Sequence, residues 1–260
     1  MRKIQVLVMC CLALGFVACN DDDKESSSIR NSAKSGTENG HEWIDLGLTS
    51  GTKWATANVG ASKPQDYGNY YAWGETTTKG TYDWSTYKYG SDYDELTKYC
   101  NDSYYGKDGF TDSKTTLDLS DDAAYVNWGG KWRMPTKAQQ DELGSECYWV
   151  WTDNYNNSNV KGYIVYKAKT SSDKGVNIYE DETPSSSYKL SDAHIFLPAA
   201  GYRDRGGLGR AGSRGGYWSS SLATVNPDFA WRVDFDSDYV SDGRDGRCYG
   251  RSVRAVIPGE

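Results

Sequence analysis

Histidine is almost absent from this 260-residue chain, which contains only His41 and His194. His41 lies at the edge of a polar spacer and His194 opens a short apolar run, so the sequence gives no support to a Ser-His-Asp arrangement. Zinc-ligand spacing, a phosphate-binding loop and a dinucleotide fingerprint are missing as well. We therefore expect neither a cofactor nor an enzymatic activity.

Long apolar runs are also scarce, and the clearest one lies at the N-terminus. Arg2 and Lys3 precede the run Ile4–Val17, which is too short for a stable membrane span and leads through small residues to Cys19. This pattern predicts a secretory signal over residues 1–18 and acylation of Cys19, which would anchor the chain in the outer membrane. Ordinary cleavage, with Cys19 as an incidental thiol, is the alternative.

An acidic and then polar segment follows Cys19. Residues 20–25 read Asn-Asp-Asp-Asp-Lys-Glu, and Ser, Gly and Asn are frequent as far as Gly40. Such a composition buries too little apolar surface to fold, so we expect a tether over residues 19–40. The acidic run resembles the export signal of Bacteroidota surface lipoproteins, which implies display at the cell exterior. The formal charge of −7 argues against a nucleic-acid partner.

Long aliphatic side chains are few, whereas aromatic residues make up 14% of the chain, with 10 Trp and 21 Tyr beside 28 Gly. Short alternating runs and frequent glycine predict antiparallel strands and tight turns. Thr136 and Gln139 form a capping-box signature for a helix that ends near Cys147. Ser120 precedes a second short helix over 121–127, and 92–100 favours a third. The expected strands are 43–46, 53–57, 69–73, 148–152, 162–167, 194–197, 217–221, 229–235 and 252–256. Together these elements predict one α+β domain over residues 41–260.

Several motifs resemble those of one bacterial lipoprotein family: Trp43–Leu48, Lys53–Gly60, Tyr70–Glu75, Trp128–Thr136, Gly216–Ser221 and Ser252–Arg254. The family is the Fibrobacter succinogenes major paralogous domain. It is related to the C-type-lectin-like fold of formylglycine-generating enzymes and of the variable proteins of diversity-generating retroelements. The resemblance covers about residues 41–256 and implies a C-type-lectin-like domain with short antiparallel strands. It does not fix the function, because one fold serves many functions.

Lysine and glutamate are absent from residues 199–254, which hold nine arginines and seven aspartates. Short or planar charged groups suit recognition. The alternation along Phe229–Asp238 predicts that its charged residues share one solvent face of a strand, and glycine-rich loops over 203–216 and 241–250 add further charges. In C-type-lectin-like relatives these segments line the ligand-binding face. A merely solvated strand with its loops is the alternative. The predicted ligand contacts are Tyr202, Asp204, Arg205, Arg210, Arg214, Asp228, Arg232, Asp234, Asp236, Tyr239, Asp242, Arg244, Asp245 and Tyr249.

The same segment has a second regularity. Apart from Trp218 and Trp231, every residue in it can be encoded by a codon that ends in a pyrimidine. Adenine-directed mutagenesis by a diversity-generating retroelement yields such a set. We therefore hypothesise that all the predicted contacts except Tyr202 and Asp242 are diversified. Gly209, Phe229, Ser241 and Gly243 belong to the same hypothesised set. Four other side chains are expected to pack in the core rather than to contact a ligand: Trp132, Met134, Trp218 and Trp231.

Three cysteines lie in the predicted domain. In an oxidising envelope Cys100 and Cys147 are the candidate disulfide, which leaves Cys248 unpaired. A formylglycine-generating enzyme would need a reactive cysteine pair near the C-terminus, where Cys248 is alone. The sequence therefore favours non-enzymatic recognition of an extracellular protein or glycan by a surface lipoprotein, as a receptor or adhesin. An oxidase of the formylglycine-generating kind and a structural subunit of a surface assembly are the alternatives.

Overall fold

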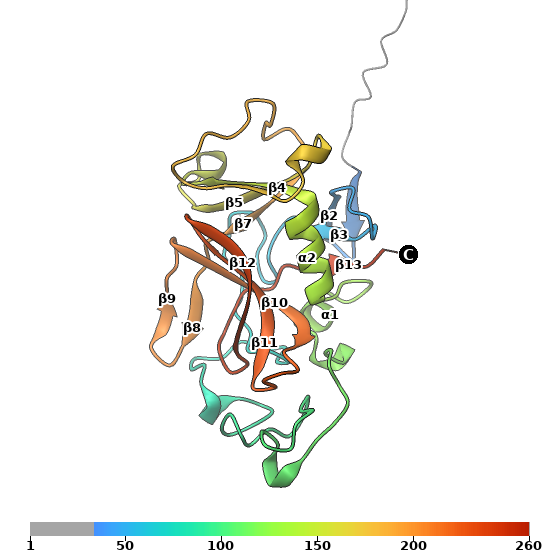
Figure 1. Cartoon of the computed structure of the whole chain (residues 1–260), viewed down its shortest axis with the longest axis vertical. Helices are drawn as coiled ribbons and strands as arrows, with labels where there is room; N and C mark the ends of the chain where they lie inside the picture. Colours follow the sequence, from blue (N-terminus) through green and yellow to red (C-terminus); the bar gives the residue numbers. More distant parts are fainter. Residues whose placement is uncertain (1–33, 260) are drawn as a thin grey trace, which may run out of the picture. The chain divides into compact units, whose positions relative to one another are not determined.

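Small antiparallel sheets and two short α-helices make up the part of the chain that the computed structural model describes, residues 34–259 (Figure 1). The predicted α+β class is confirmed at this level. The signal over residues 1–18 and Cys19 lie outside the described residues. Residues 35–38 belong to a strand paired with residues 41–44, so the expected tether over 19–40 extends too far toward the C-terminus.

The strands are arranged in three sheets and one hairpin. The first sheet has the order β1 (Ser35–Glu38), β2 (His41–Asp45), β3 (Lys53–Ala55) and β13 (Val256–Ile257). The second has the order β6 (Val176–Ile178), β4 (Cys147–Thr152), β5 (Gly162–Lys167) and β7 (His194–Pro198), with β6 parallel to β4. The third consists of β10 (Arg214–Leu222), β11 (Phe229–Asp236) and β12 (Tyr239–Gly246), and the hairpin of β8 (Tyr202–Asp204) and β9 (Gly207–Gly209).

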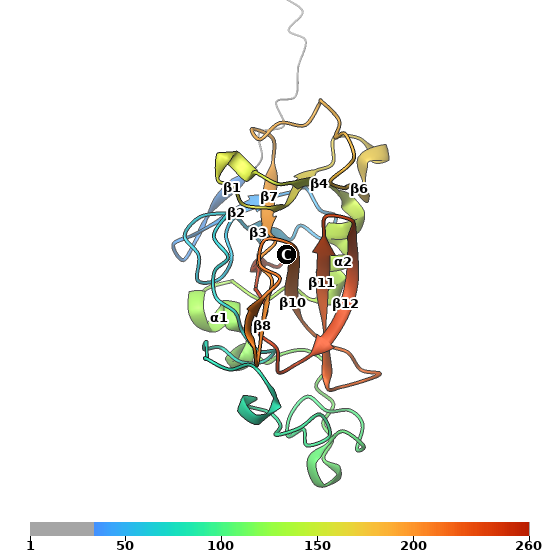
Figure 2. The same cartoon turned by 90° about the vertical axis from the view of Figure 1, so that its left-hand side faces the viewer.

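Helix α2 (Lys137–Glu146) begins as the sequence predicts. The Thr136 side chain accepts a hydrogen bond from the Gln139 backbone, and the Gln139 side chain accepts one from the Thr136 backbone. The helix buries Leu143 and packs on β10 and β11, so that the third sheet lies between α2 and the β8–β9 hairpin (Figures 1 and 2).

Helix α1 (Ala123–Trp128) is capped by Asp122 and not by Ser120, which the sequence predicts. The Asp122 carboxylate accepts hydrogen bonds from the backbone of Ala124 and Tyr125. Ser120 lies instead in a 3-10 turn over Leu119–Asp121. The same carboxylate also accepts from the backbone of Met134, which fixes the helix to the buried segment before α2.

A long coil over residues 56–118 takes the place of two elements that the sequence predicts. The expected strand over 69–73 and the helix over 92–100 are wrong: this segment holds 3-10 turns and isolated bridges. Its buried carbonyls are satisfied by aromatic side chains, as when the Tyr87 hydroxyl donates to Trp73 O (2.7 Å) and the Trp218 indole to Tyr71 O (2.9 Å). Tyrosine and tryptophan suit such a core because each brings a large apolar body with one polar end. This use explains much of the aromatic content.

Candidate functional site

The predicted alternation along β11 is confirmed, but the predicted exposure is not. Arg232 and Asp234 lie on the side of β11 that Arg251 and Tyr202 of β8 approach, whereas Val233 and Phe235 pack in the core cluster that contains Leu143 of α2. We call these two sides of the third sheet the polar face and the helix face. Only 7% of Arg232 and 4% of Asp234 is exposed, because Arg251 and Tyr202 lie over the polar face.

An ionic network joins the charged residues of the polar face. Asp234 accepts from Arg214 Nε (2.9 Å) and from the Tyr239 hydroxyl (2.8 Å), and Arg232 Nη1 lies 2.5 Å from its Oδ1. Asp245 contacts Arg251 and lies 3.6 Å from Arg232 Nε. Burial by itself would raise the pKa of Asp234, but the hydrogen bond from Arg214 and the charge of Arg232 lower it overall. Within this network the carboxylates alternate with guanidinium groups.

Two glycines make room for these guanidinium groups. A Cβ atom at Gly216 would collide with Arg251, and one at Gly243 would lie 3.3 Å from Arg232 Cζ. Arg232 Nη1 is paired with Asp234, but Nε of Arg232 and both Nε and Nη1 of Arg251 have no hydrogen-bond partner among residues 34–259. Water or a ligand oxygen would satisfy these donors, so the network is not closed.

The other predicted contacts do not share this face. Asp242 and Arg244 point to the helix face, because residues of β12 alternate as those of β11 do. Arg205 is exposed on the hairpin and pairs with Asp83 (2.9 Å). The remaining residues are placed as follows: Asp204 in β8, Arg210 in an exposed left-handed turn, Asp228 buried before β11 and Tyr249 half-buried against the core. The single ligand face expected for all of them is wrong.

Several arginines of the segment 199–254 have a structural role. Arg247 is fully buried and donates to the Tyr87 hydroxyl and to the carbonyls of Lys98, Tyr99 and Pro227, at 2.8–2.9 Å. Arg254 is buried in the same way, against carbonyls of residues 55, 56 and 196. Buried coil leaves carbonyls that no ladder satisfies, and a guanidinium with five donors serves several of them where an ammonium cannot. This need explains part of the preference for arginine over lysine.

The helix face is hollowed at two adjoining places. One hollow of about 560 Å³ lies between α2, β6 and β12, with Val233 and Val240 on its floor and Gln140, Asp141 and Asn177 among its polar lining residues. The other, of about 580 Å³, is lined by Asn226, Phe229, Trp231, Asp242, Gly243 and Arg244. Asp242 borders both hollows, so we treat them as one groove, which we call the β12 groove. Its mixture of apolar surface and a few polar groups is typical of ligand sites.

Trp231 is the residue of this groove that the sequence analysis misplaced. Trp132, Met134 and Trp218 are buried as expected, but Trp231 is partly exposed. Helix α2 begins at Lys137, whose Nζ lies 4.7 Å from the centre of the Trp231 ring, and the helix covers Val233 and Phe235 farther along the strand. The period-two pattern gave the side of the strand correctly. It could not show where the covering helix begins.

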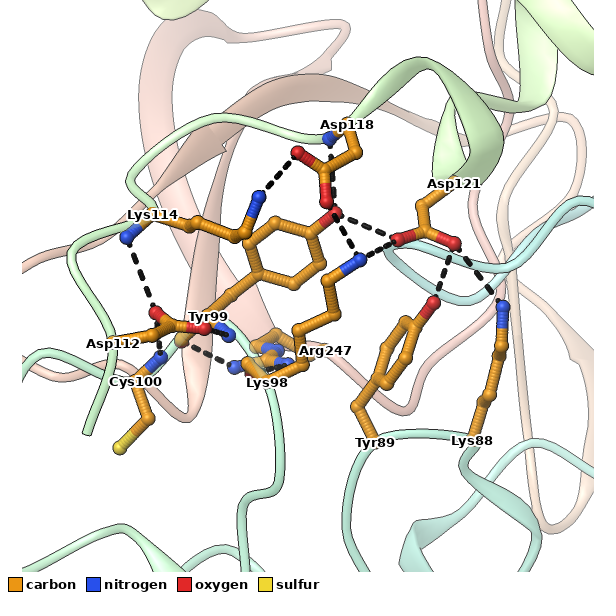
Figure 3. A network of polar contacts seen from close by, with 10 residues as sticks. All are labelled: Lys88, Tyr89, Lys98, Tyr99, Cys100, Asp112, Lys114, Asp118, Asp121 and Arg247. Atoms are coloured by element: carbon orange, nitrogen blue, oxygen red, sulfur yellow. Dashed lines mark hydrogen bonds and ion pairs between the residues drawn. The ribbon is translucent and has the colours of Figure 1, made fainter. Parts of the chain in front are cut away.

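A second polar cluster lies around Asp121, and no sequence motif indicated it (Figure 3). The buried carboxylate accepts from the hydroxyls of Tyr89 (2.5 Å) and Tyr99 (2.7 Å) and from the ammonium groups of Lys88 (3.1 Å) and Lys98 (2.6 Å). Burial opposes its charge, but these hydrogen bonds hold the pKa of Asp121 far below its usual range. Both carboxylate oxygens are occupied, so we interpret the cluster as an anchor for the coil.

The predicted disulfide between Cys100 and Cys147 is wrong. Both residues are free thiols, as is Cys248. Cys147 packs with Leu143 at the start of β4, whereas the Cys100 thiol donates to Asp102 O in the coil. Burial raises the pKa of the Cys248 thiol to about 12.

Comparison with known proteins yields no relative: no family model matches the chain, and neither curated proteins nor solved structures give a match. Within residues 34–259 no helix has the length and apolar character that a bilayer crossing requires.

Proposed function

We propose that this protein is a surface-exposed lipoprotein whose C-type-lectin-like domain binds an extracellular protein or glycan without catalysis. Acylation of Cys19 would tether it to the outer membrane, facing the cell exterior. The observation that carries the recognition role is the β12 groove, where Trp231 is partly exposed beside Asp242 and Arg244. Partly exposed aromatic and arginine side chains are the groups that dominate interface energetics.

The groove replaces the polar face as the centre of this proposal. Arg232 and Asp234 are buried and bound to each other, whereas Asp242 and Arg244 are exposed. A ligand in the groove would meet an indole ring, a guanidinium and a carboxylate within one hollow. Such a set recognises a polar surface with apolar patches, as glycans and protein loops both present.

The same burial pattern reduces the number of positions at which we expect diversification. Replacement of Arg232 or Asp234 would remove one charge from a buried ion-pair network, which costs several kcal/mol. Variation is tolerated more easily at the exposed residues Ser241 and Arg244 of β12 and at Arg205 and Arg210 of the hairpin region. If the gene is diversified, codon changes should concentrate at these four positions.

Binding of the purified full chain to glycan and protein arrays tests the recognition role. We expect Trp231→Ala and Arg244→Ala to lose the ligand that the wild type captures. Arg205→Ala/Arg210→Ala, which removes two exposed guanidinium groups outside the groove, is the matched control. Loss of binding in the control alone would move the site to the hairpin, and no ligand for the wild type on either array would contradict the proposal.

The anchor is tested separately. Metabolic labelling with an alkyne fatty acid should mark the wild-type chain and not Cys19→Ala. Surface exposure should then appear as sensitivity of intact cells to added protease. A labelled Cys19→Ala chain would show that acylation occurs elsewhere.

A further inference from the structure

A loop over residues 91–112 lies at the end of the folded unit away from β1 (Figures 1 and 2). Its backbone is fixed by hydrogen bonds from Leu96 N to Tyr105 O and from Lys107 N to Leu96 O, both at 2.9 Å. Asp112 adds hydrogen bonds from its carboxylate to the backbone of Tyr99 and Cys100. The loop therefore presents its outer side chains in a preorganised arrangement.

Two tyrosines on this loop project into solvent beside two carboxylates. Tyr93 is 42% exposed and Tyr104 67% exposed. Leu96 and Gly106 form a parallel bridge, which brings the segment around Asp94 alongside Tyr104, and Asp92 Oδ1 accepts a hydrogen bond from Tyr93 N (2.8 Å). The charge of Asp94 and then the neighbouring Tyr104 hydroxyl also raise the pKa of Tyr93. We call Asp92, Tyr93, Asp94 and Tyr104 the tyrosine–aspartate patch.

The carboxylates of the patch lack a cationic partner within the described chain. The neighbouring lysines are engaged elsewhere: Lys107 pairs with Glu95 (3.4 Å), and Lys98 pairs with Asp118 and Asp121. Residues 91–112 hold six acidic and two basic side chains, so the loop has a local excess of negative charge. A partner that complements the patch must carry positive charge.

We propose that the tyrosine–aspartate patch binds an arginine-bearing segment of a partner protein. Exposed tyrosine rings attract a cation over their faces, and a carboxylate at the rim takes up its N–H groups. Arginine fits better than lysine, because a planar guanidinium stacks on a ring while it donates to a carboxylate. None of the four patch residues lines the β12 groove, and the role of the patch does not depend on the function proposed above.

Fluorescence anisotropy of the purified full chain with a labelled peptide of four Gly-Arg repeats tests the proposal. We expect Tyr93→Ala/Tyr104→Ala and Asp92→Asn/Asp94→Asn each to weaken binding about tenfold. The equivalent Gly-Lys peptide should bind the wild type several-fold more weakly. All four positions are at the surface, and thermal unfolding of each variant verifies that the fold is kept.

The control separates a specific site from the overall negative charge. Asp108→Asn/Asp238→Asn removes the same amount of charge from exposed positions outside the patch. Binding by this variant should remain close to that of the wild type. Equal weakening in the control and in Asp92→Asn/Asp94→Asn would overturn the proposal, as would absence of binding by the wild type at 50 mM salt.

Discussion

Trp231 of β11 lies directly opposite Arg244 of β12, and the guanidinium carbon is 5.5 Å from the centre of the indole ring. Lys137 approaches the same ring and also lies 3.3 Å from Asp242. The indole is therefore held among two cations and a carboxylate on the helix face of β11, the central strand of the third sheet. This arrangement fixes its orientation while leaving part of it in solvent.

Truncation of Trp231 should separate recognition from stability. Trp231→Ala is expected to weaken ligand binding about tenfold or more, while the free energy of unfolding falls by about 2 kcal/mol, because part of the side chain is in solvent already in the folded chain. Trp218→Ala, which empties a fully buried site, should cost about 3–5 kcal/mol. Urea unfolding of both variants makes the comparison. Equal destabilisation would show that Trp231 is a core residue after all.

Replacement of Arg247 should be severe even though the residue touches no groove. Arg247→Met leaves the carbonyls of Lys98, Tyr99 and Pro227 buried without a donor, and we expect a loss of about 3–5 kcal/mol in unfolding free energy. Arg205→Met is the control, since its guanidinium is largely in solvent. A change below about 1 kcal/mol in Arg247→Met would contradict the structural role.

Asp121 should make the stability of the fold depend on pH in the acidic range. Its pKa in the folded chain lies below the value of about 3.9 for an unfolded aspartate, so the unfolded chain binds the proton first. The stabilisation is therefore present above pH of about 4 and is lost as the pH falls toward the folded pKa. Asp121→Asn should be less stable at pH 7 by about 3 kcal/mol and should lose less on acidification.

Chemical denaturation at several pH values measures this effect. The curves of the wild type and of Asp121→Asn should converge as the pH approaches 2. Asp141→Asn, which removes an exposed carboxylate paired with Lys137, is expected to run parallel to the wild type. Parallel curves for Asp121→Asn would exclude the anchor interpretation.

The three thiols of the folded part should be reduced and should be protected from alkylation in the native state. Cys100, Cys147 and Cys248 are buried, and burial raises the pKa of each. Iodoacetamide should therefore modify them only after unfolding, as peptide mapping by mass spectrometry would show. A peptide pair linked through Cys100 and Cys147 would restore the disulfide that the structure contradicts.

Local patterns gave reliable predictions where a single element decides the outcome. The capping box at Thr136 located α2, the strand expected over 162–167 coincides with β5, and period two gave the two sides of β11. The expected helix over 92–100 failed because that segment is held by partners outside it, among them the carboxylates of Asp112 and Asp121. Burial of Arg232 and Arg247 was likewise decided by segments far apart in sequence, about which a local pattern carries no information.

The coil over residues 56–118 keeps its place by phenol, indole and guanidinium groups that reach carbonyls, rather than by ladders of paired strands. A ladder demands a fixed register, whereas a side-chain donor demands only that an acceptor lie within reach. Insertions and altered turns should thus reduce the stability of the fold less in this coil than in the sheets. The surface turns of this region, including the loop over residues 91–112, can therefore change in evolution while the buried side chains remain packed.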